Sequence, residues 1–481
     1  MTFKKHPKNW FRATATVAAL VFITACGSAK KVDEETDTQV ETQTDSQIKN
    51  LVERSYQYVA MFNVIQKFTF DESSGAMFAG GFNKSIAATA LADHHMTSIA
   101  RPNNDTLYQL NTLDLRDDAM IIEFPAIDSK FAALQISGYS HYTGVPLTTT
   151  EGDFSKPTKV LFYTERTKGY AGEAVEGVDK IVEADGDFFI AVLRAMPHQI
   201  DATRMAGIVK SLQDTKIISL AEFQGKSAKA TSPVVFPQYK ATDVNIFEEN
   251  LAEVIQFVMN HTTFDENDEM DQAFLAAFKP FGIAPGNTFD AEKAQVLSNK
   301  RISEIASEVQ QETLASFMNP EVTARVLPQL FMPKGQVDLE AQVFQSVIGP
   351  IGLPAHQAMY FPLGSVMNSE NDYVIKMTAD QLPPAQAFWS ITLYDFENGF
   401  FIPNDQMKYS VGENAGFKLD SEGGLEIHIS AEQPIGVPAE NWLPISRDNI
   451  GLALQIRVYH PRLAEMPAWI ENMPAAEVVE K

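Results

Sequence analysis

The chain has 481 residues, of which 45% are hydrophobic and 21% charged, and its formal net charge at pH 7 is −24. This length and apolar content suffice for two or three packed domains, whereas the acidic balance disfavours binding to nucleic acid or to anionic lipid. A single cysteine excludes intramolecular disulfides and zinc sites built from several thiolates.

The first 25 residues have the order of a secretory signal: a basic start, then an apolar run over 13–25 that is shorter than the roughly 20 residues of a membrane span. The segment Ile-Thr-Ala-Cys that ends at Cys26 resembles the lipobox of bacterial lipoproteins. That resemblance implies cleavage before Cys26 and a diacylglycerol on its thiol, which would anchor the protein to a membrane. Gly27, in place of an aspartate, favours the outer membrane, with the protein facing the periplasm. The alternative is a buried free thiol.

Polar and acidic residues follow the cysteine. Residues 26–47 cannot bury enough apolar surface to order themselves, so we expect a flexible tether there, after a signal peptide over 1–25. Loss of the signal peptide removes four basic residues and no acidic ones, which makes the net charge more negative still.

Helical spacing opens the folded part. Apolar residues from Ser46 to Phe68 recur at intervals of three and four, which predicts a helix. From Leu107 the period falls to two, and turn residues separate short segments, as in an antiparallel sandwich or barrel. The expected strands are 112–115, 120–124, 131–136, 160–163 and 188–193.

The middle of the chain, from 201 to 345, has few strand patterns. Apolar stripes over 247–258 and 270–278 predict two helices, and Asp290 is the expected N-cap of another helix that runs through Leu314. This part of the sequence therefore predicts a helical segment.

Two-residue alternation returns after Gly349. It predicts strands over 373–377, 387–394, 425–429 and 452–459. The expected fold class is α+β, with two antiparallel β-sandwich or jelly-roll-like domains and a helical segment between them. The expected boundaries are 48–210 for the N-terminal β domain with its leading helix, 211–345 for the helical linking domain and 346–481 for the C-terminal β domain.

The stretch 101–108, Arg-Pro-Asn-Asn-Asp-Thr-Leu-Tyr, is an unusually dense group of polar residues. Pro102 biases Arg101 towards an extended conformation. One interpretation is an Asx-type turn with a structural arginine. The other is a ligand site for an anionic or sugar-like molecule, in which Arg101 is a bidentate donor beside Asn103, Asn104 and Asp105.

A second polar group lies on the strands of the C-terminal part. Alternation over 388–395 places Trp389 and Asp395 on one face and Tyr394 on the other. A tryptophan on a strand face is more often part of a core, and sites tend to collect at strand ends such as that at Asp395. Arg457 shares a face with Tyr459, and we expect it to form a structural salt bridge with a carboxylate of a neighbouring sheet.

No metal site and no cofactor is predicted. His94 and His95 are adjacent, and on a helix their side chains would diverge by about 100°. The acidic run 265–271 lacks the glycine at the sixth position and the acid at the twelfth position of a calcium loop. The chain also lacks a Gly-x-Ser-x-Gly elbow, a Walker loop and a dinucleotide-binding glycine pattern.

Several of these segments resemble a known pair of bacterial domains. The stretch 101–108 resembles the signature of domain of unknown function 1254, and 381–395 resembles that of its usual C-terminal partner, domain of unknown function 1214. Segments 441–444 and 457–461 are similar to the closing part of the second domain. The resemblance implies two β-sandwich-like domains with a helical segment between them, and it implies no agreed reaction.

The sequence leaves three functions open. The first is an envelope lipoprotein that binds a small polar ligand or a partner protein in a cleft between the β domains. The second is a periplasm-facing hydrolase or lyase with Asp105 or Asp395 as general base and Arg101 as anion clamp. The third is a structural envelope protein, and a homo-oligomer is compatible with each. We expect Arg101 and Asp105 to face a cleft shared with the C-terminal domain. The candidate ligand-binding residues are Arg101, Asn103, Asn104, Asp105, Tyr108, Trp389, Tyr394 and Arg457.

Overall fold

The computed structural model describes residues 44–97, 100–317 and 319–479. The expected signal peptide, Cys26 and most of the expected tether lie outside the described residues. Within them, no helix combines the length and the apolar character that crossing a bilayer requires. The first helix begins at Asp45, slightly inside the tether that the sequence predicts up to residue 47.

Helix α1 (Asp45–Phe70) begins at a capping box. The side chain of Thr44 accepts a hydrogen bond from the Gln47 N–H, and the Gln47 side chain accepts one from the Thr44 N–H. Although α1 precedes every strand, it packs with helices from the middle of the chain. These are α4 (Asp243–Glu249), α5 (Leu251–His261), α6 (Glu269–Phe278), α8 (Lys300–Ser316) and α10 (Leu339–Ile348).

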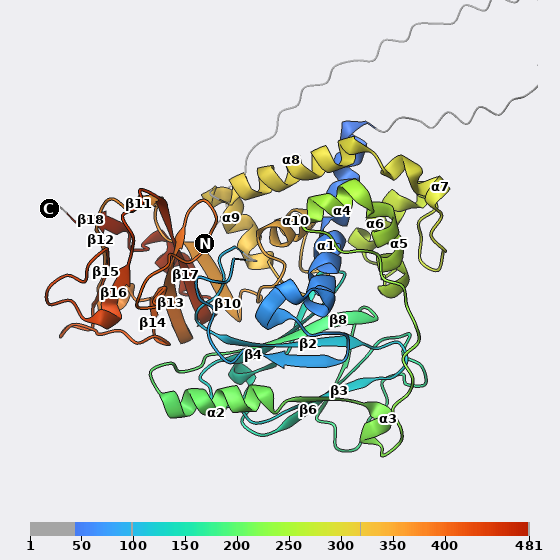
Figure 1. The fold of residues 1–481 in the computed structure, drawn as a ribbon, viewed down its shortest axis with the longest axis horizontal. Coiled ribbons are helices and arrows are strands. Elements are labelled where there is room, and N and C mark those ends of the chain that lie inside the picture. The colour runs from blue at the N-terminus through green and yellow to red at the C-terminus, as the bar shows by residue number, and fades with distance from the viewer. Residues whose placement is uncertain (1–43, 98–99, 318, 480–481) are drawn as a thin grey trace, which may run out of the picture. The chain divides into compact units, whose positions relative to one another are not determined.

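Two sheets form the N-terminal β-sandwich (Figure 1). The first has the order β1-β2-β8-β4-β5 and is antiparallel throughout. Its strands are Lys84–Ala87, Leu107–Asp114, Phe188–Ala195, Ala132–Gly138 and Thr143–Thr148. The second has the order β7-β6-β3-β9, in which only β6 and β7 run parallel. Its strands are Lys180–Glu183, Thr158–Tyr163, Met120–Phe124 and Lys216–Ser219.

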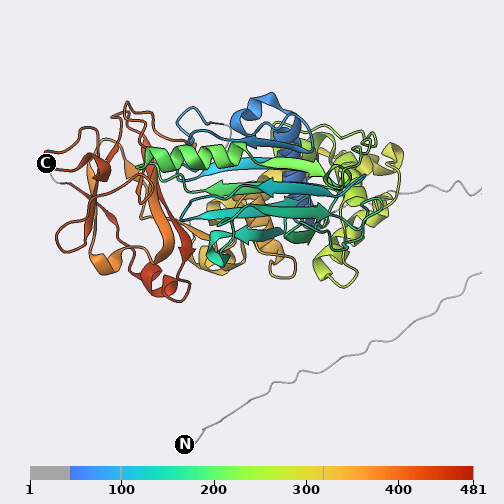
Figure 2. The ribbon, with the colours of Figure 1, turned by 90° about the horizontal axis from the view of Figure 1, so that it is seen from below.

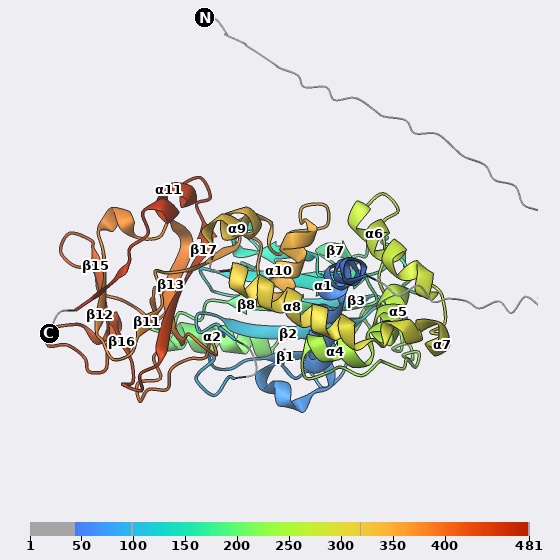
Figure 3. The same ribbon diagram turned by 90° about the horizontal axis from the view of Figure 1, so that it is seen from above.

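Both faces of the first sheet are covered. One face meets the second sheet through a core that includes Leu113, Ile122 and Phe162. The opposite face, with Leu110, Ile190 and Val192, packs on the helices, and Figure 3 shows α8 and α10 lying over β8 and β2. Helix α2 (Ala202–Gln213) packs Ile208 and Leu212 against the core between the two sheets, and Figure 2 shows it running alongside their strands.

A second sandwich forms the C-terminal part. One sheet has the order β10-β17-β13-β14, with β11 also on β17, and the other has the order β16-β15-β12-β18. Apolar residues on their facing sides, among them Ile391, Ile427 and Ile456, make the core. The first sheet contains β10 (Ala358–Pro362), β17 (Gly451–Pro461), β13 (Ala385–Asp395), β14 (Ser410–Gly412) and β11 (Met367–Asn368). The second sheet contains β16 (Trp442–Pro444), β15 (Leu425–Ser430), β12 (Tyr373–Met377) and β18 (Ala476–Val478).

The outer face of the β13–β17 sheet packs against the N-terminal sandwich. Phe388 and Tyr459 stack with ring centroids 4.0 Å apart, and Phe131 meets both rings edge-on. This contact places the loop before β2 directly against β13 and β17.

The expected fold class is confirmed, and the principal expected strands are present with bounds shifted by a few residues. One expected helix is wrong. Asp290 caps only the short helix α7 (Ala291–Ala294). The helical conformation ends at Ser298, and Asn299 then caps α8. The extended backbone at Asn299 starts a new helix because its side chain accepts from the Arg301 N–H. The remaining α-helices of the described residues are α3 (Leu220–Phe223), α9 (Pro320–Val326) and α11 (Met466–Glu471).

Candidate functional site

The carboxylate of Asp105 lies at the contact between the two sandwiches. The residue is only 1% exposed, and its Oδ2 accepts hydrogen bonds from Ser390 Oγ at 2.6 Å and from the Tyr459 hydroxyl at 3.0 Å. Asn103 holds it from the other side, because Asn103 Oδ1 accepts the Asp105 N–H at 2.6 Å and Asn103 Nδ2 donates to the Tyr459 hydroxyl at 2.9 Å. The predicted Asx-type turn is thus present, and it ties the loop to β13 and β17.

Arg457 is the cation of the same contact and is 3% exposed. Its guanidinium donates to Thr392 Oγ1 at 2.8 Å, to the Tyr394 hydroxyl at 2.7 Å and to the backbone carbonyl of Arg101 at 3.1 Å. Tyr394 in turn donates to the carbonyl of Pro102 at 2.6 Å. The expected salt bridge of Arg457 is wrong: within the described residues its partners are neutral oxygens, and no carboxylate lies within ion-pair distance.

Asp105 and Arg457 nevertheless act on each other through space. Burial raises the pKa of Asp105, and the charge of Arg457 and the hydrogen bonds from Ser390 and Tyr459 offset part of this effect. Burial opposes the charge of Arg457, but Tyr394 and Asp105 outweigh it and raise the pKa of that guanidinium. The contact between the domains therefore contains a buried carboxyl group and a buried guanidinium that interact electrostatically without a direct hydrogen bond.

Two other candidate residues have structural partners. Asn104 Nδ2 donates to the carbonyl of Ala92 at 2.6 Å, and its Oδ1 accepts from Ser410. Asp395 closes a turn, since its carboxylate accepts the backbone N–H groups of Asn398 and Phe400.

Trp389 and Tyr108 take no part in these hydrogen bonds. Trp389 is in the core of the C-terminal sandwich, where its ring stacks on Phe417 at 5.3 Å. Tyr108 is on β2, with its ring beside the guanidinium of Arg194 at 5.5 Å. The structure thus brings Arg101, Asn103 and Asp105 together with Tyr394 and Arg457, and it leaves Trp389 elsewhere.

The backbone of Arg101 departs from the expected extended conformation. Its φ is +52°, in the left-handed region that non-glycine residues seldom adopt. The Arg101 N–H donates to the carbonyl of Gly399 at 2.7 Å, and this bond holds the loop against the turn after β13. Pro102 restricts its predecessor, but this tertiary bond prevails. The result turns the Arg101 side chain away from Asp105 and into a separate pocket.

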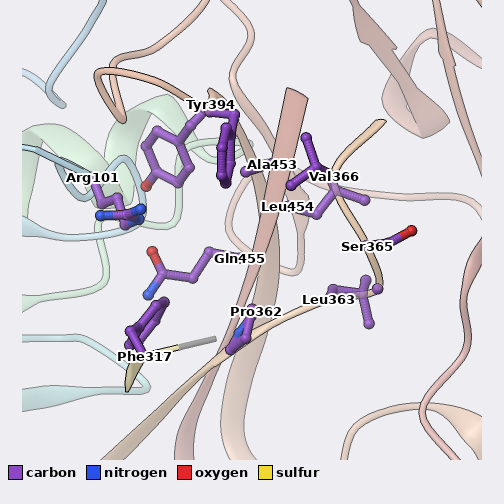
Figure 4. A pocket seen from close by; sticks show the side chains of 12 residues that line it. Arg101, Phe317, Pro362, Leu363, Ser365, Val366, Tyr394, Ala453, Leu454 and Gln455 are labelled. Carbon is purple, nitrogen blue, oxygen red and sulfur yellow. The ribbon is translucent and has the colours of Figure 1, made fainter. Parts of the chain in front are cut away.

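This pocket, called the Arg101 pocket below, is a shallow, partly open depression with a cavity volume of about 30 Å³. Figure 4 shows the guanidinium of Arg101, the Tyr394 side chain and the amide of Gln455 towards one end, with Leu363 and Val366 towards the other. The remaining lining residues are Phe317, Pro362, Gly364, Ser365, Phe396, Ala453 and Leu454.

Arg101 is half-buried in this pocket and lies over the ring of Phe317, with 5.6 Å between Cζ and the ring centroid. Burial lowers the pKa of its guanidinium, although the charge of Asp395 partly counters this effect. Among the described residues that line the pocket, none is acidic. A cation in a largely apolar pocket whose described lining has no acidic residue is suited to an anion from solution.

No metal centre emerges from the described residues, which contain no group of three histidine, cysteine, aspartate or glutamate side chains suited to an ion. His94, considered above for its neighbour His95, has its Nδ1 2.6 Å from the hydroxyl of Tyr409. His95 instead contacts Asp93 at 3.0 Å.

Sequence reasoning missed several residues of the site. Thr392 could have been found, because strand alternation places it on the face of Tyr394. Phe317 follows α8, and Gln455 lies on β17, in segments without any polar cluster. No local pattern connects these two residues to Arg101.

Comparisons with known proteins agree with the domain signatures. Residues 82–218 match the family described as "Protein of unknown function (DUF1254)", and residues 362–463 match "Protein of unknown function (DUF1214)". The chain therefore carries an N-terminal DUF1254 domain and a C-terminal DUF1214 domain. No curated protein matches it.

One solved structure supports the fold. The crystal structure of the VPA0106 protein from Vibrio parahaemolyticus is 20% identical, with a TM-score of 0.66 over 90% of this chain and 100% of that chain. An uncharacterized protein from Burkholderia cenocepacia is 12% identical and covers 90% of this chain and 95% of its own. Its TM-score is 0.42, which is too low to support an argument. The first likeness concerns the fold alone.

Proposed function

We propose that this protein is an envelope lipoprotein, anchored through Cys26, that binds a small organic anion in the Arg101 pocket. The ligand has an anionic head for the guanidinium and an apolar body for the walls around Leu363 and Val366. The pocket is built from the loop before β2, the end of α8 and the C-terminal sandwich, so a ligand there contacts both β domains.

One observation carries the proposal: the half-buried Arg101 side chain points into a pocket without an acidic lining residue. A guanidinium loses hydration in such a place, and an anionic ligand restores the lost interaction by accepting two parallel hydrogen bonds. The Gln455 amide supplies a further donor at the same end, and the apolar walls add affinity for each buried methylene group.

The enzymatic alternative has less support from the geometry. A general base must reach a substrate proton, but Asp105 is 1% exposed and engaged by Ser390 and Tyr459. Asp395 is engaged by two backbone N–H groups of its own turn. Neither carboxylate lines the Arg101 pocket.

Binding is tested by calorimetry on the full chain, purified in a mild detergent, with hexanoate as the probe. We expect saturable binding that is stronger than that of acetate, because the apolar walls contact only the longer chain. Arg101→Met should weaken hexanoate binding at least tenfold. Arg462→Met removes an exposed arginine that pairs with Glu465 and serves as the matched control with unchanged affinity. Equal hexanoate binding by wild type and Arg101→Met would overturn the assignment.

The membrane anchor needs a separate test. Cells that express the full chain are labelled with radioactive palmitate, and we expect the label on the wild type and its loss in Cys26→Ser. An unlabelled wild type, or a labelled Cys26→Ser variant, contradicts the lipoprotein proposal and leaves the ligand-binding proposal standing.

A further inference from the structure

A second arginine, Arg194, is buried in the N-terminal sandwich near its contact with the C-terminal sandwich. It lies on β8 and is 2% exposed, with Tyr108 opposite it on β2. Its Nη2 donates to Gln135 Oε1 on β4 at 2.7 Å. Gln135 itself is 1% exposed, so both side chains are almost completely removed from solvent.

Two donors of this pair have no acceptor. In the part of the chain that the structure describes, Arg194 Nε and Gln135 Nε2 are both buried without a hydrogen-bond partner. Turning the Gln135 amide cannot remove the mismatch, because a guanidinium only donates and therefore requires the amide oxygen. Buried donors without acceptors are rare and destabilising, so an acceptor from outside the chain is expected here.

The charges point to an anion rather than to a neutral acceptor. Arg457 has a buried carboxyl group in its surroundings, Asp105, whereas the only side chain that hydrogen-bonds Arg194 among the described residues is the neutral amide of Gln135. Tyr108 contributes the face of its ring to Arg194, which is a weaker interaction than an ion pair. One positive charge at this contact is thus left without a negative counterpart among its immediate partners.

Two partly exposed tyrosines border the buried pair. Tyr108 on β2 and Tyr360 on β10 each keep part of their surface accessible, although they flank buried neighbours. The charge of Arg194 acts on Tyr360, which places the two side chains near each other across the contact. A planar guanidinium, an amide N–H and two aromatic rings are a typical environment for a small carboxylate.

We infer that Arg194 and Gln135 form a second, buried anion site, distinct from the Arg101 pocket, that takes a small carboxylate. The carboxylate accepts hydrogen bonds from Arg194 Nε and Gln135 Nε2, and its charge balances the guanidinium. Since the site lies where β2, β4 and β8 meet the C-terminal sandwich, a bound carboxylate stabilises the contact between the domains.

The test measures the thermal midpoint of the full chain, in detergent and in a carboxylate-free buffer, as acetate is added. A ligand that binds only the folded state raises this midpoint. We expect a saturable rise for the wild type, an unchanged rise for the exposed-arginine control Arg462→Met, and at least a tenfold loss of acetate affinity for Arg194→Met.

Gln135→Glu gives a sharper result, because it places a carboxylate of the same shape against Arg194. We expect a higher midpoint without acetate and no further rise with it. Gln109→Glu is the matched control: Gln109 is equally buried, but its side-chain amide donates to Ser85 and to the Leu212 carbonyl rather than to an arginine, so the variant should be destabilised.

Three outcomes overturn the inference. The first is the absence of any acetate effect on the wild type, and the second is equal acetate affinity in wild type and Arg194→Met. The third is a destabilised Gln135→Glu that resembles Gln109→Glu. The last outcome applies even when Arg194→Met fails to fold, and it indicates a buried water as the acceptor.

Discussion

Replacing Arg457 by methionine removes the buried cation and leaves Asp105 as an uncompensated buried carboxylate. Three hydrogen bonds of 2.7–3.1 Å, to Thr392, Tyr394 and the Arg101 carbonyl, disappear with it. Removing one partner of a buried charge pair costs about 3–5 kcal/mol, and we expect Arg457→Met to lose this much of its free energy of unfolding. The exposed Arg462→Met, whose ion pair with Glu465 is solvated, should lose less than about 1 kcal/mol.

The second half of this test is a double-mutant cycle with Asp105→Asn. The asparagine keeps an acceptor for Ser390 and Tyr459 but carries no charge, so it should relieve part of the damage in the Arg457→Met background. We expect a coupling energy of about 1–3 kcal/mol between the two positions. Urea unfolding followed by tryptophan fluorescence is a suitable assay, because Trp389, Trp442 and Trp469 all lie in the C-terminal part of the chain. Additive effects, or an Arg457→Met variant as stable as Arg462→Met, would refute the argument.

Three further predictions concern pH and packing. Burial raises the pKa of Asp105 above its usual 3.8, so the folded state binds the carboxyl proton more tightly than the unfolded state does. The free energy of unfolding of the wild type, relative to that of Asp105→Asn, should therefore fall as pH rises above 3.8. A difference between the two proteins that stays flat or rises contradicts this. Burial lowers the pKa of His141 from 6.5 to about 4, so the wild type should lose stability relative to His141→Gln as pH falls from 6.5 towards 4, by up to about 3 kcal/mol in urea unfolding. Trp389→Ala should cost about 3–5 kcal/mol through a core cavity and leave hexanoate affinity unchanged; weaker hexanoate binding by a folded variant would return Trp389 to the ligand site.

Local patterns predicted the elements of this fold well. The strand over Tyr373–Met377 has the bounds that alternation indicates, and the face of β13 that carries Tyr394 was identified from its period of two. Short edge strands such as Lys84–Ala87 and Lys180–Glu183 were missed, because they are partly exposed and lack a continuous apolar face. Their positions depend on pairing with β2 and β6, which no local pattern encodes.

The candidate site was predictable as a composition but not as a geometry. The dense polar stretch at 101–108 lies against the second β domain. Arg101 lines a pocket there as expected, but Asp105 is buried in the contact and lines no pocket, so the expectation that both face a cleft holds only for Arg101. The sequence could not show that the two side chains separate. That separation follows from the bond between the Arg101 N–H and Gly399, a residue almost three hundred positions away. Gln135 and Arg194 have no distinctive neighbours in sequence, and only the sheet register makes them a pair.

Ligand binding in the Arg101 pocket should depend on the contact between the domains. The Arg101 pocket takes its guanidinium from the loop before β2 and its walls from β10 and β17, so it exists only while the domains are in contact. Apparent affinity falls in proportion to the fraction of molecules in the binding-competent state. Ser390→Ala removes one hydrogen bond to Asp105 and should cost roughly 1.5–3 kcal/mol, which leaves most molecules competent if the contact is several kcal/mol stable. We therefore expect unchanged hexanoate affinity for Ser390→Ala in dilute buffer and a steeper loss of that affinity than in wild type as urea is added. Parallel loss in both proteins would mean that the Asp105 network does not hold the pocket together.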